Sequence, residues 1–508
     1  MKKLLMLLTL FISLSVGATT YNPTSIAQAN SYTLQPGDIV TFARGVVYND
    51  AQLNVNYSGT AQNPITYTTR GTGNAPIISK AGDQAMQIYH KNYIVIDGLN
   101  FTDPTMDPNN HTLQSNVDLG INIDGSNYIT IQNCTFSLVG AGINIVGDYN
   151  TVKNCTMTNL RMIRNTPTNV NSDDDYGANP VVIGGANNNI LGNIFKDCWA
   201  VSYDYGFDGG AVEIYGGGTN NNIIMYNIAD NCNGFLEFGS GNGGTSANNY
   251  FAYNRITNCD GLVYINNSGQ YTLNVTNLQF YNNSIAYTGT TMLGGEWFIA
   301  KANSAGSAGQ IVLKNNVFWA AEGIDIVQSS RFGTGQVVHE NNVYKLGPGS
   351  VLGFTIGGSE KTTDATVWTN VSSPNPSQWD MNVPLSSAAY RAGQTLGIQL
   401  DIVGHAVATV PSAGAYEFIG TVLNIPLPTP TPQPTPPTTY QFYTYSTQNY
   451  IITLNARKRG WFYITNNSGV KVLKGTYKVG TTNISMAGAT PGVYYFKGQY
   501  NGPYKIIR

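Results

Sequence analysis

The stretch Gly209–Gly239, GGAVEIYGGGTNNNIIMYNIADNCNGFLEFG, decides the fold. It contains two phrases of one pattern, AVEIYG at 211–216 and FLEFG at 235–239, in which a glutamate stands between apolar residues. Such alternation is typical of a β-strand with one buried and one exposed face. A second short strand and a turn rich in Gly and Asn separate the phrases. A repeat of this size cannot bury its apolar face alone, so it indicates one coil of a solenoid.

If the two phrases are neighbouring coils, Glu213 and Glu237 lie on adjacent strands, about 4.8 Å apart, and both point outward. Two stacked carboxylates repel, and this repulsion raises the pKa of one of them toward the range of a general acid. A spacing near 5 Å is also that of retaining glycosidases. The alternative is a pair of solvated surface glutamates.

The same register predicts an outward column that carries polar and aromatic groups. Its members are Asn122, Asn144, Val182, Glu213, Glu237, Tyr264, Phe298 and Asp325. A second, inward column of asparagines recurs at intervals of 34, 27, 29, 33 and 26 residues: Asn193, Asn227, Asn254, Asn283, Asn316 and Asn342. Stacked asparagines bond from coil to coil and satisfy buried turns, so we interpret this inward column as structural.

The five cysteines all lie inside the repeats. Cys198, Cys232 and Cys259 follow equivalent strand positions and predict one column, whereas Cys134 and Cys155 precede the asparagines in theirs. An odd number in an extended core favours buried, stacked thiols. Adjacent coils do come within disulfide range, so a Cys232–Cys259 bridge stays open.

Composition restricts the class of protein. The chain has 508 residues, a net charge of −2 and 11% charged residues, which argues against nucleic acid and anionic membranes as partners. Residues 1–18 carry Lys2, Lys3, an apolar run and small residues before a cleavage point, as a secretory signal peptide does. No later segment reaches membrane-spanning length. We therefore expect a secreted or cell-surface protein, and a monomer.

Several N-terminal phrases carry a family resemblance: LQPGD at 34–38, SGT-x-x-NPI at 58–65, TRGTG at 69–73 and YIVIDGLNF at 93–101. They resemble the first coils of secreted right-handed parallel β-helix proteins of the pectate-lyase-like superfamily. The resemblance implies an all-β, right-handed parallel β-helix over 19–420. It does not imply one reaction, because that fold carries lyases, hydrolases and proteins without activity.

A linker rich in Pro and Thr follows at 421–440, and residues 441–508 alternate in the manner of a small β-sandwich. The end of this segment, PGVYYFK at 491–497 and the terminal KIIR, resembles the C-terminal sorting domain of the Bacteroidetes type IX secretion system. That resemblance implies the outer-membrane secretion machinery as a partner. The RKR at 457–459 departs from the family pattern.

Two insertions, 161–180 and 198–210, interrupt the coils just before Glu213. Insertions on one face of a solenoid commonly build its binding site, so we expect both to wall the glutamates. Asp208 in the second insertion is a third candidate catalytic carboxylate. A hard cation such as calcium, which β-helix lyases often use, is expected at Asp173, Asp174, Asp175 and Asp204. The alternative for that acidic run is a solvated loop.

The remaining candidates would hold a polysaccharide. Aromatic rings suit sugar faces, and arginines bind uronate carboxylates; the predicted set is Arg161, Arg164, Tyr203, Tyr205, Tyr215, Tyr264 and Asp325. No lysine stands in the outward column, so a lyase would need Arg164, a tyrosine or Lys301 of a neighbouring column as its base. This absence favours hydrolysis over β-elimination. Two functions remain: an enzyme that cleaves a polysaccharide, by hydrolysis or elimination, and a β-helix that only binds glycans or acts as an adhesin.

Overall fold

The computed structural model describes residues 17–267, 271–288, 296–303 and 309–418, together with seven strands nearer the C-terminus. The chain divides into two compact units, Met1–Thr429 and Pro430–Arg508. The linker at 421–440 and most of the signal peptide lie outside the described residues. Export, the linker and the sorting domain therefore stay predictions.

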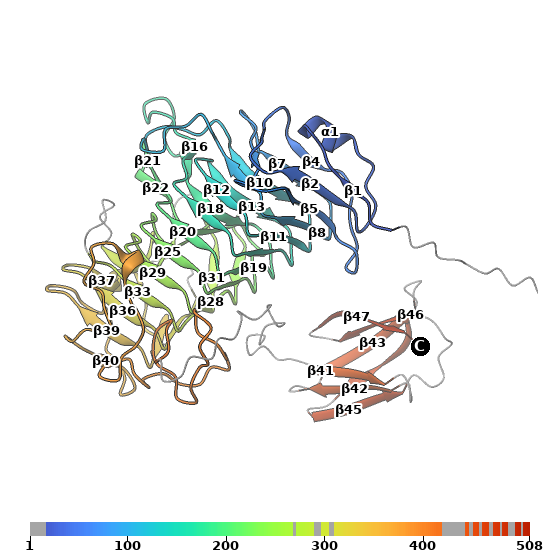
Figure 1. Ribbon diagram of the computed structural model, residues 1–508. Helices are drawn as coiled ribbons and strands as arrows, with labels where there is room; N and C mark the ends of the chain where they lie inside the picture. The colour runs from blue at the N-terminus through green and yellow to red at the C-terminus, as the bar shows by residue number, and fades with distance from the viewer. Residues whose placement is uncertain are drawn as a thin grey trace, which may run out of the picture. The chain divides into compact units, whose positions relative to one another are not determined.

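The first unit consists of three parallel sheets, and successive coils add one strand to each sheet (Figure 1). Sheet 1 contains β1 (Thr20–Tyr21), β2 (Ile39–Ala43), β5 (Ile65–Arg70), β8 (Ile94–Asp97), β11 (Ile129–Gln132), β14 (Thr151–Lys153), β19 (Asn189–Leu191), β24 (Ile223–Met225), β28 (Tyr250–Ala252), β32 (Leu278–Tyr281), β35 (Ile311–Lys314) and β38 (Val337–Glu340).

The ten-stranded second sheet is called the site sheet below, because it carries Glu213 and Glu237. It contains β4 (Leu53–Val55), β7 (Met86–Tyr89), β10 (Leu119–Asp124), β13 (Ala141–Val146), β18 (Asn179–Ile183), β23 (Val212–Tyr215), β26 (Leu236–Gly239), β30 (Val263–Ile265), β34 (Trp297–Lys301) and β37 (Asp325–Val327).

Sheet 3 contains β3 (Val47–Tyr48), β6 (Ile77–Ile78), β9 (Asn100–Thr102), β12 (Thr135–Ser137), β15 (Thr156–Thr158), β20 (Ile194–Lys196), β25 (Ile228–Asp230), β29 (Arg255–Thr257), β33 (Ser284–Ala286), β36 (Val317–Ala320), β39 (Val343–Leu346) and β40 (Lys361–Thr362). These three sheets confirm the predicted all-β parallel β-helix.

Smaller elements decorate the coils: α1 (Ile26–Ser31), the 3₁₀ turns η1 (Ser329–Arg331) and η2 (Pro376–Gln378), and the parallel pair β27 (Thr245–Ala247) and β31 (Asn274–Thr276). Each insertion folds into an antiparallel hairpin. The first pairs β16 (Met162–Arg164) with β17 (Tyr176–Gly177), and the second pairs β21 (Trp199–Ser202) with β22 (Gly206–Gly209).

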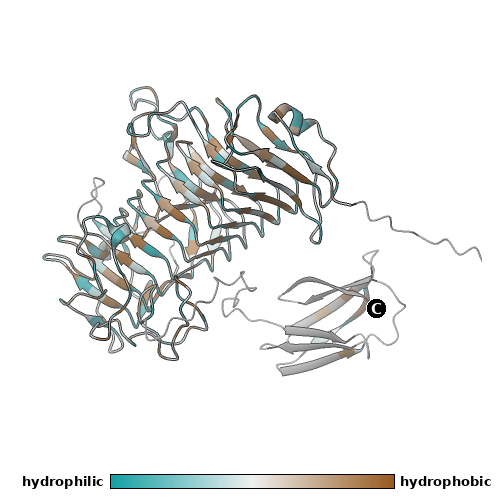
Figure 2. Cartoon of the chain, in the orientation of Figure 1, coloured by the Kyte–Doolittle hydropathy of each residue, from teal (hydrophilic) through white to brown (hydrophobic). Residues whose placement is uncertain are grey.

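The core follows from the alternation seen in the sequence. Inward residues such as Val212, Ile214 and Phe238 are at most 1% exposed, whereas the residues between them face outward. Figure 2 shows hydrophobic residues along the strands of the first unit. At about 25 cal/mol per Å² of apolar area, burial of these stacked rows is the main stabilising contribution to the helix.

The predicted inward asparagine column is confirmed. The Oδ1 of Asn254 accepts from the Asn227 backbone N–H at 3.0 Å, and its Nδ2 donates to Ile224 O at 2.9 Å. The pattern repeats through the column, which ends at the buried carboxylate of Glu360, where Asn342 donates at 3.0 Å. A second buried ladder, which the sequence analysis missed, runs through Asn150, Asn188, Asn222 and Asn249.

The five cysteines are buried and free, so the Cys232–Cys259 bridge left open above is not formed. Cys155 takes a place in the asparagine column, since its backbone N–H donates to Asn193 Oδ1 at 2.9 Å. Cys232 forms side-chain hydrogen bonds with both Cys198 and Cys259. The thiols therefore pack as a stacked column, as predicted.

The described strands of the second unit are all antiparallel. One sheet pairs β41 (Phe442–Ser446), β42 (Ile451–Ala456) and β45 (Gly480–Ser485). The other pairs β43 (Gly460–Asn466), β44 (Lys471–Tyr477), β46 (Val493–Gly498) and β47 (Asn501–Ile507). Packing of these sheets as a sandwich stays a prediction.

Candidate functional site

The two glutamates face each other across neighbouring strands of the site sheet. β23 pairs with β26 in parallel, and Glu213 stands opposite Glu237, which confirms the predicted register. Both side chains are partly exposed, and the residues on either side of each are buried. Adjacent strands lie about 4.8 Å apart, so the two carboxylates share one place on the outer face.

Neighbouring amides hold both carboxylates in position. Asn179, at the start of β18, donates its Nδ2 to Glu213 Oε2 at 2.8 Å. The Asn266 side chain forms a hydrogen bond with Glu237. The sequence analysis missed both amides, since neither belongs to the outward column.

The pKa values of both glutamates are raised, which favours their protonated forms. Burial, followed by the charges of Glu237 and Asp208, raises the pKa of Glu213 from 4.5 to about 8. Burial also raises the pKa of Glu237 to about 7, against the lowering effect of its hydrogen bond with Asn266. Glu237 is thus the more acidic of the pair, and at neutral pH the site holds fewer charges than carboxylates.

Asp208 joins the pair from the second insertion. It lies on β22 opposite Ala200, and burial together with the charge of Glu237 raises the pKa of Asp208 to about 8. The hairpins thus stand at the upstream edge of the glutamates, as the sequence indicated. Glu213, Glu237 and Asp208 form what we call the carboxylate cluster.

The two insertions are joined through Asp204. Its Oδ2 accepts the backbone N–H groups of Asp173, Asp174 and Asp175 at 2.8, 3.1 and 3.3 Å. Burial raises the pKa of Asp204, but these hydrogen bonds outweigh that effect and hold it below its usual value. Asp204 is therefore ionised and fastens one hairpin to the other.

Three of the predicted metal ligands lie together. Oxygens of Asp174, Asp175 and Asp204 are within 4.8 Å of one another. The Oδ1 atoms of Asp174 and Asp204 are buried without a hydrogen-bond partner, which is costly unless a cation is bound. This donor set fits part of a calcium shell of six to eight oxygens. Asp173 lies outside the group, and its Oδ1 accepts from the Tyr205 hydroxyl at 2.7 Å.

The structure contradicts the proposed role of Arg161. This side chain is 0% exposed, and its Nη1 donates to Leu160 O and to Asn159 Oδ1 at 2.9 and 2.8 Å, while its Nη2 donates to Pro108 O at 2.9 Å. Arg161 is committed to turn carbonyls and cannot reach a substrate. Arg164 is exposed, and its Nη1 lies 3.6 Å from Asp174 Oδ2.

The predicted tyrosines are all on the surface. Tyr203, Tyr205, Tyr215 and Tyr264 are 60%, 49%, 41% and 42% exposed. Tyr264 stands directly beside Glu237 on β30, and its pKa is raised by burial and by the Glu237 charge. Arg331, which the sequence analysis also missed, acts on Tyr264 in the opposite direction.

The predicted outward column is wrong beyond Tyr264. Ala300, not Phe298, stands opposite Tyr264, and Phe298 is 2% exposed. Asp325 pairs with Trp297, three positions back along β34, and its Oδ1 accepts from the Val351 N–H at 2.9 Å. Asp325 therefore lies about 10 Å along the strand direction from the column, and the register that predicted its substrate-binding role is wrong.

The sequence and the fold agree on the class of protein. Residues 105–296 match the family model of the right-handed β-helix region, inside the three parallel sheets described above. No curated protein matches the chain. Among the described residues, no helix has both the length and the apolar character needed to span a membrane.

Solved structures similar to this chain include an alginate lyase from Paenibacillus sp. str. FPU-7, at 16% identity and a TM-score of 0.40, over 64% of this chain and 99% of that one. A GH136 lacto-N-biosidase from Eubacterium ramulus matches with 14% identity and a TM-score of 0.39, over 65% of this chain and 68% of that one. The tailspike protein gp49 from Acinetobacter baumannii bacteriophage Fri1, a capsular polysaccharide depolymerase, matches with 11% identity and a TM-score of 0.30, over 96% of this chain and 83% of that one. No activity of this chain follows from likenesses of this size.

Proposed function

We propose that this protein cleaves a polysaccharide by glycosidic hydrolysis at the carboxylate cluster. The observation that carries the proposal is the opposed pair Glu213 and Glu237, with pKa values of about 8 and about 7. A glycosidase needs one protonated and one ionised carboxyl group at the same pH. Two acids with separated, raised pKa values meet that need near neutrality.

The amides around the pair support an assignment of roles. Glu237 has the lower pKa and a hydrogen bond with Asn266, so it is the carboxylate that attacks the anomeric carbon. Glu213 retains its proton and gives it to the leaving glycosidic oxygen as the C–O bond breaks. Water then releases the sugar from the Glu237 ester, with Glu213 as base. A strand spacing of about 4.8 Å favours this retaining course.

The basic residues near the cluster argue against β-elimination, which needs a base to remove a proton next to the uronate carboxyl group. Lys301 is 0% exposed, and its Nζ lies 5.0 Å from the ring centre of Phe332. Tyr264 has a raised pKa, so it is a poor base at neutral pH. Elimination is thus the weaker candidate.

A panel of soluble polysaccharides tests the proposal: polygalacturonate, alginate, xylan and mixed β-glucan, each followed by reducing ends and by absorbance of unsaturated uronates. Reducing ends without absorbance support hydrolysis. Both signals together identify a lyase and overturn the proposed chemistry. Binding without either signal favours the alternative function, a glycan-binding protein or adhesin.

We also propose that the protein is exported, on the basis of the leader-like residues 1–18 and the sorting-domain resemblance of 441–508. Fractionation of expressing cells, with N-terminal sequencing of the recovered protein, tests this. Recovery from the cytoplasm with Met1 intact would exclude export.

A further inference from the structure

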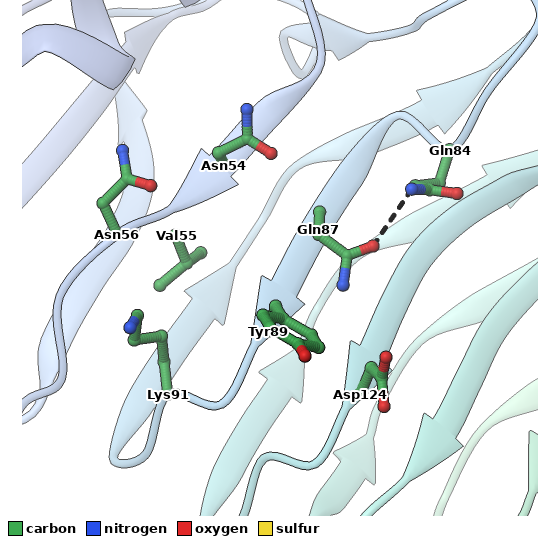
Figure 3. A pocket seen from close by; sticks show the side chains of 8 residues that line it. All are labelled: Asn54, Val55, Asn56, Gln84, Gln87, Tyr89, Lys91 and Asp124. Atoms are coloured by element: carbon green, nitrogen blue, oxygen red, sulfur yellow. Dashed lines mark hydrogen bonds between the residues drawn. The ribbon is translucent and has the colours of Figure 1, made fainter.

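A polar pocket opens on the site sheet, far from the carboxylate cluster. It has a volume of about 510 Å³ and is lined by residues of β4, β7, β10 and the turn after β7. Figure 3 shows Tyr89 between Lys91 and Asp124, with Gln87 above it. Tyr89 is 55% exposed, so its ring is accessible to a ligand.

The pocket and the cluster belong to one outward column. In strand register, Gln87 stands opposite Asn122, Asn122 opposite Asn144, Asn144 opposite Val182 and Val182 opposite Glu213. Gln87 is thus four strand spacings from Glu213, or about 19 Å. That distance spans several sugar residues of an extended chain lying along the column.

Three side chains separate Gln87 from Glu213: the amides of Asn122 and Asn144, which are bonded in series with Gln87, and then the apolar Val182. Asn144 Nδ2 donates to Asn122 Oδ1 at 2.8 Å, and Asn122 Nδ2 donates to Gln87 Oε1 at 2.9 Å. Gln84 Nε2 donates to the same Gln87 oxygen at 3.0 Å. These bonds fix the Gln87 amide plane and turn its Nε2 toward Tyr89 (Figure 3).

The chemistry of the pocket suits a sugar. Pyranose hydroxyls both donate and accept, and the pocket offers the Gln87 Nε2 and Lys91 ammonium as donors and the Asp124 carboxylate as acceptor. The exposed Tyr89 ring, whose centroid lies 4.2 Å from that of the His90 ring, suits the apolar face of a pyranose. Lys91 and Asp124 together add no net charge, so the pocket does not select strongly for an anion.

We propose that this pocket is a distal subsite, which binds a pyranose residue of the chain that is cleaved at Glu213 and Glu237. This inference rests on the proposed function for the direction of the bound chain. Binding of the polymer itself can be measured without cleavage. A distal subsite contributes affinity only for substrates long enough to reach it.

The test uses Tyr89→Ala in the full chain, with Tyr149→Ala as the matched control. Tyr149 is 50% exposed and stands at a turn beside Tyr128, outside the pocket. We expect Tyr89→Ala to raise KM for the polymer about tenfold and to leave kcat/KM on the shortest cleaved oligosaccharide unchanged. Tyr149→Ala is expected to change neither value.

Affinity electrophoresis of the Glu213→Gln, Glu237→Gln double variant in gels that contain the same four polysaccharides separates the two proposals. Weaker retardation on adding Tyr89→Ala supports the subsite even if the parent protein cleaves nothing. Cleavage by the parent protein, with equal KM and equal retardation for Tyr89→Ala, overturns the subsite and leaves the proposed function intact. If Tyr89→Ala lowers the melting temperature, Lys91→Gln is measured in its place, with the same criteria.

Discussion

Glu213 on β23 stands directly opposite Glu237 on β26, and both side chains leave the site sheet on its outer face. Stacked like charges destabilise a sheet by a few tenths to about 1 kcal/mol. Protonation reduces this repulsion, because burial raises the pKa of Glu213 to about 8 and that of Glu237 to about 7. Carboxyl groups with raised pKa values cluster at functional sites, which supports a functional role for this pair.

Replacement of either glutamate is expected to abolish cleavage without unfolding the protein. Glu213→Gln and Glu237→Gln each remove a proton-transfer or nucleophilic group, so kcat should fall by at least about 10²-fold. The melting temperature should stay equal or rise, because the new amide cannot ionise beside the remaining carboxyl group. Activity on the best polysaccharide of the panel and thermal unfolding measure the two effects.

The matched control is Asp325→Asn, which neutralises a carboxylate on the same sheet outside the outward column. It should retain full activity. Full cleavage by the Glu213→Gln, Glu237→Gln double variant would move the chemistry elsewhere. Unfolding of both single variants would show that these side chains are needed for the fold.

The stability of the protein should depend on the proton held by Glu213. Its pKa is about 8 in the folded protein and near 4.5 in the unfolded chain, so the folded state binds the proton more tightly. The free energy of unfolding should therefore fall as pH rises from about 4.5 to about 8. Glu213→Gln lacks this loss. Urea unfolding should give equal stabilities at pH 4 and an advantage for the variant that grows as the pH rises toward 8. An advantage that grows toward low pH would contradict the raised pKa.

Cleavage should fail on the alkaline side of neutrality. The proposed acid Glu213 loses its proton near its pKa of about 8, and Asp208 ionises in the same range. We expect kcat/KM to decline above about pH 8 as one coupled titration of the cluster. Asp208→Asn removes one negative neighbour and should shift this alkaline limb to lower pH. A limb that does not move would separate Asp208 from the acid.

Calcium should stabilise the joined insertions. If the oxygens of Asp174, Asp175 and Asp204 bind the ion, a hundredfold excess over Kd adds about 2.7 kcal/mol to the free energy of unfolding. Calorimetric titration of the chelated protein measures this directly. Asp174→Asn should lose the response, whereas Asp173→Asn should keep it, because Asp173 bonds to Tyr205 instead. No heat and no thermal shift in the parent protein would remove calcium from the site.

The asparagine ladder should be sensitive to single changes. Asn254→Ala removes four hydrogen bonds, to Ile224, Asn283 and twice to Asn227, and leaves buried partners unsatisfied. We expect a loss of about 2–4 kcal/mol, seen as a lower melting temperature. Asn242→Ala, at an exposed position, is the control and should be silent. Equal stability of the two variants would argue against the ladder as a stabilising element.

The repeated strand pattern of the sequence was enough to predict the fold and the pairing of Glu213 with Glu237. Strand alternation has a period of two, and side chains on stacked coils must superpose, so AVEIYG and FLEFG could be aligned without coordinates. The buried asparagines could be predicted for the same reason. The backbone amides of each equivalent turn need a hydrogen-bond partner, so the same side chain recurs on each coil. The strand register can be predicted from the sequence only where the loops between coils have regular lengths.

Tertiary structure alone decided the rest of the site. The strand after Tyr264 is displaced by two positions from the predicted register, because the segment from β30 to β34, which includes β31, β32 and β33, differs in length from the coils before it. Burial also assigned Arg161 to turn carbonyls, which its charge did not reveal. Asp208 reaches the glutamates from the second hairpin, whereas Asn179 reaches Glu213 from the start of β18. Backbone hydrogen bonds set the position of each strand relative to the next. The position of a loop depends instead on tertiary side-chain contacts, which the local sequence does not reveal.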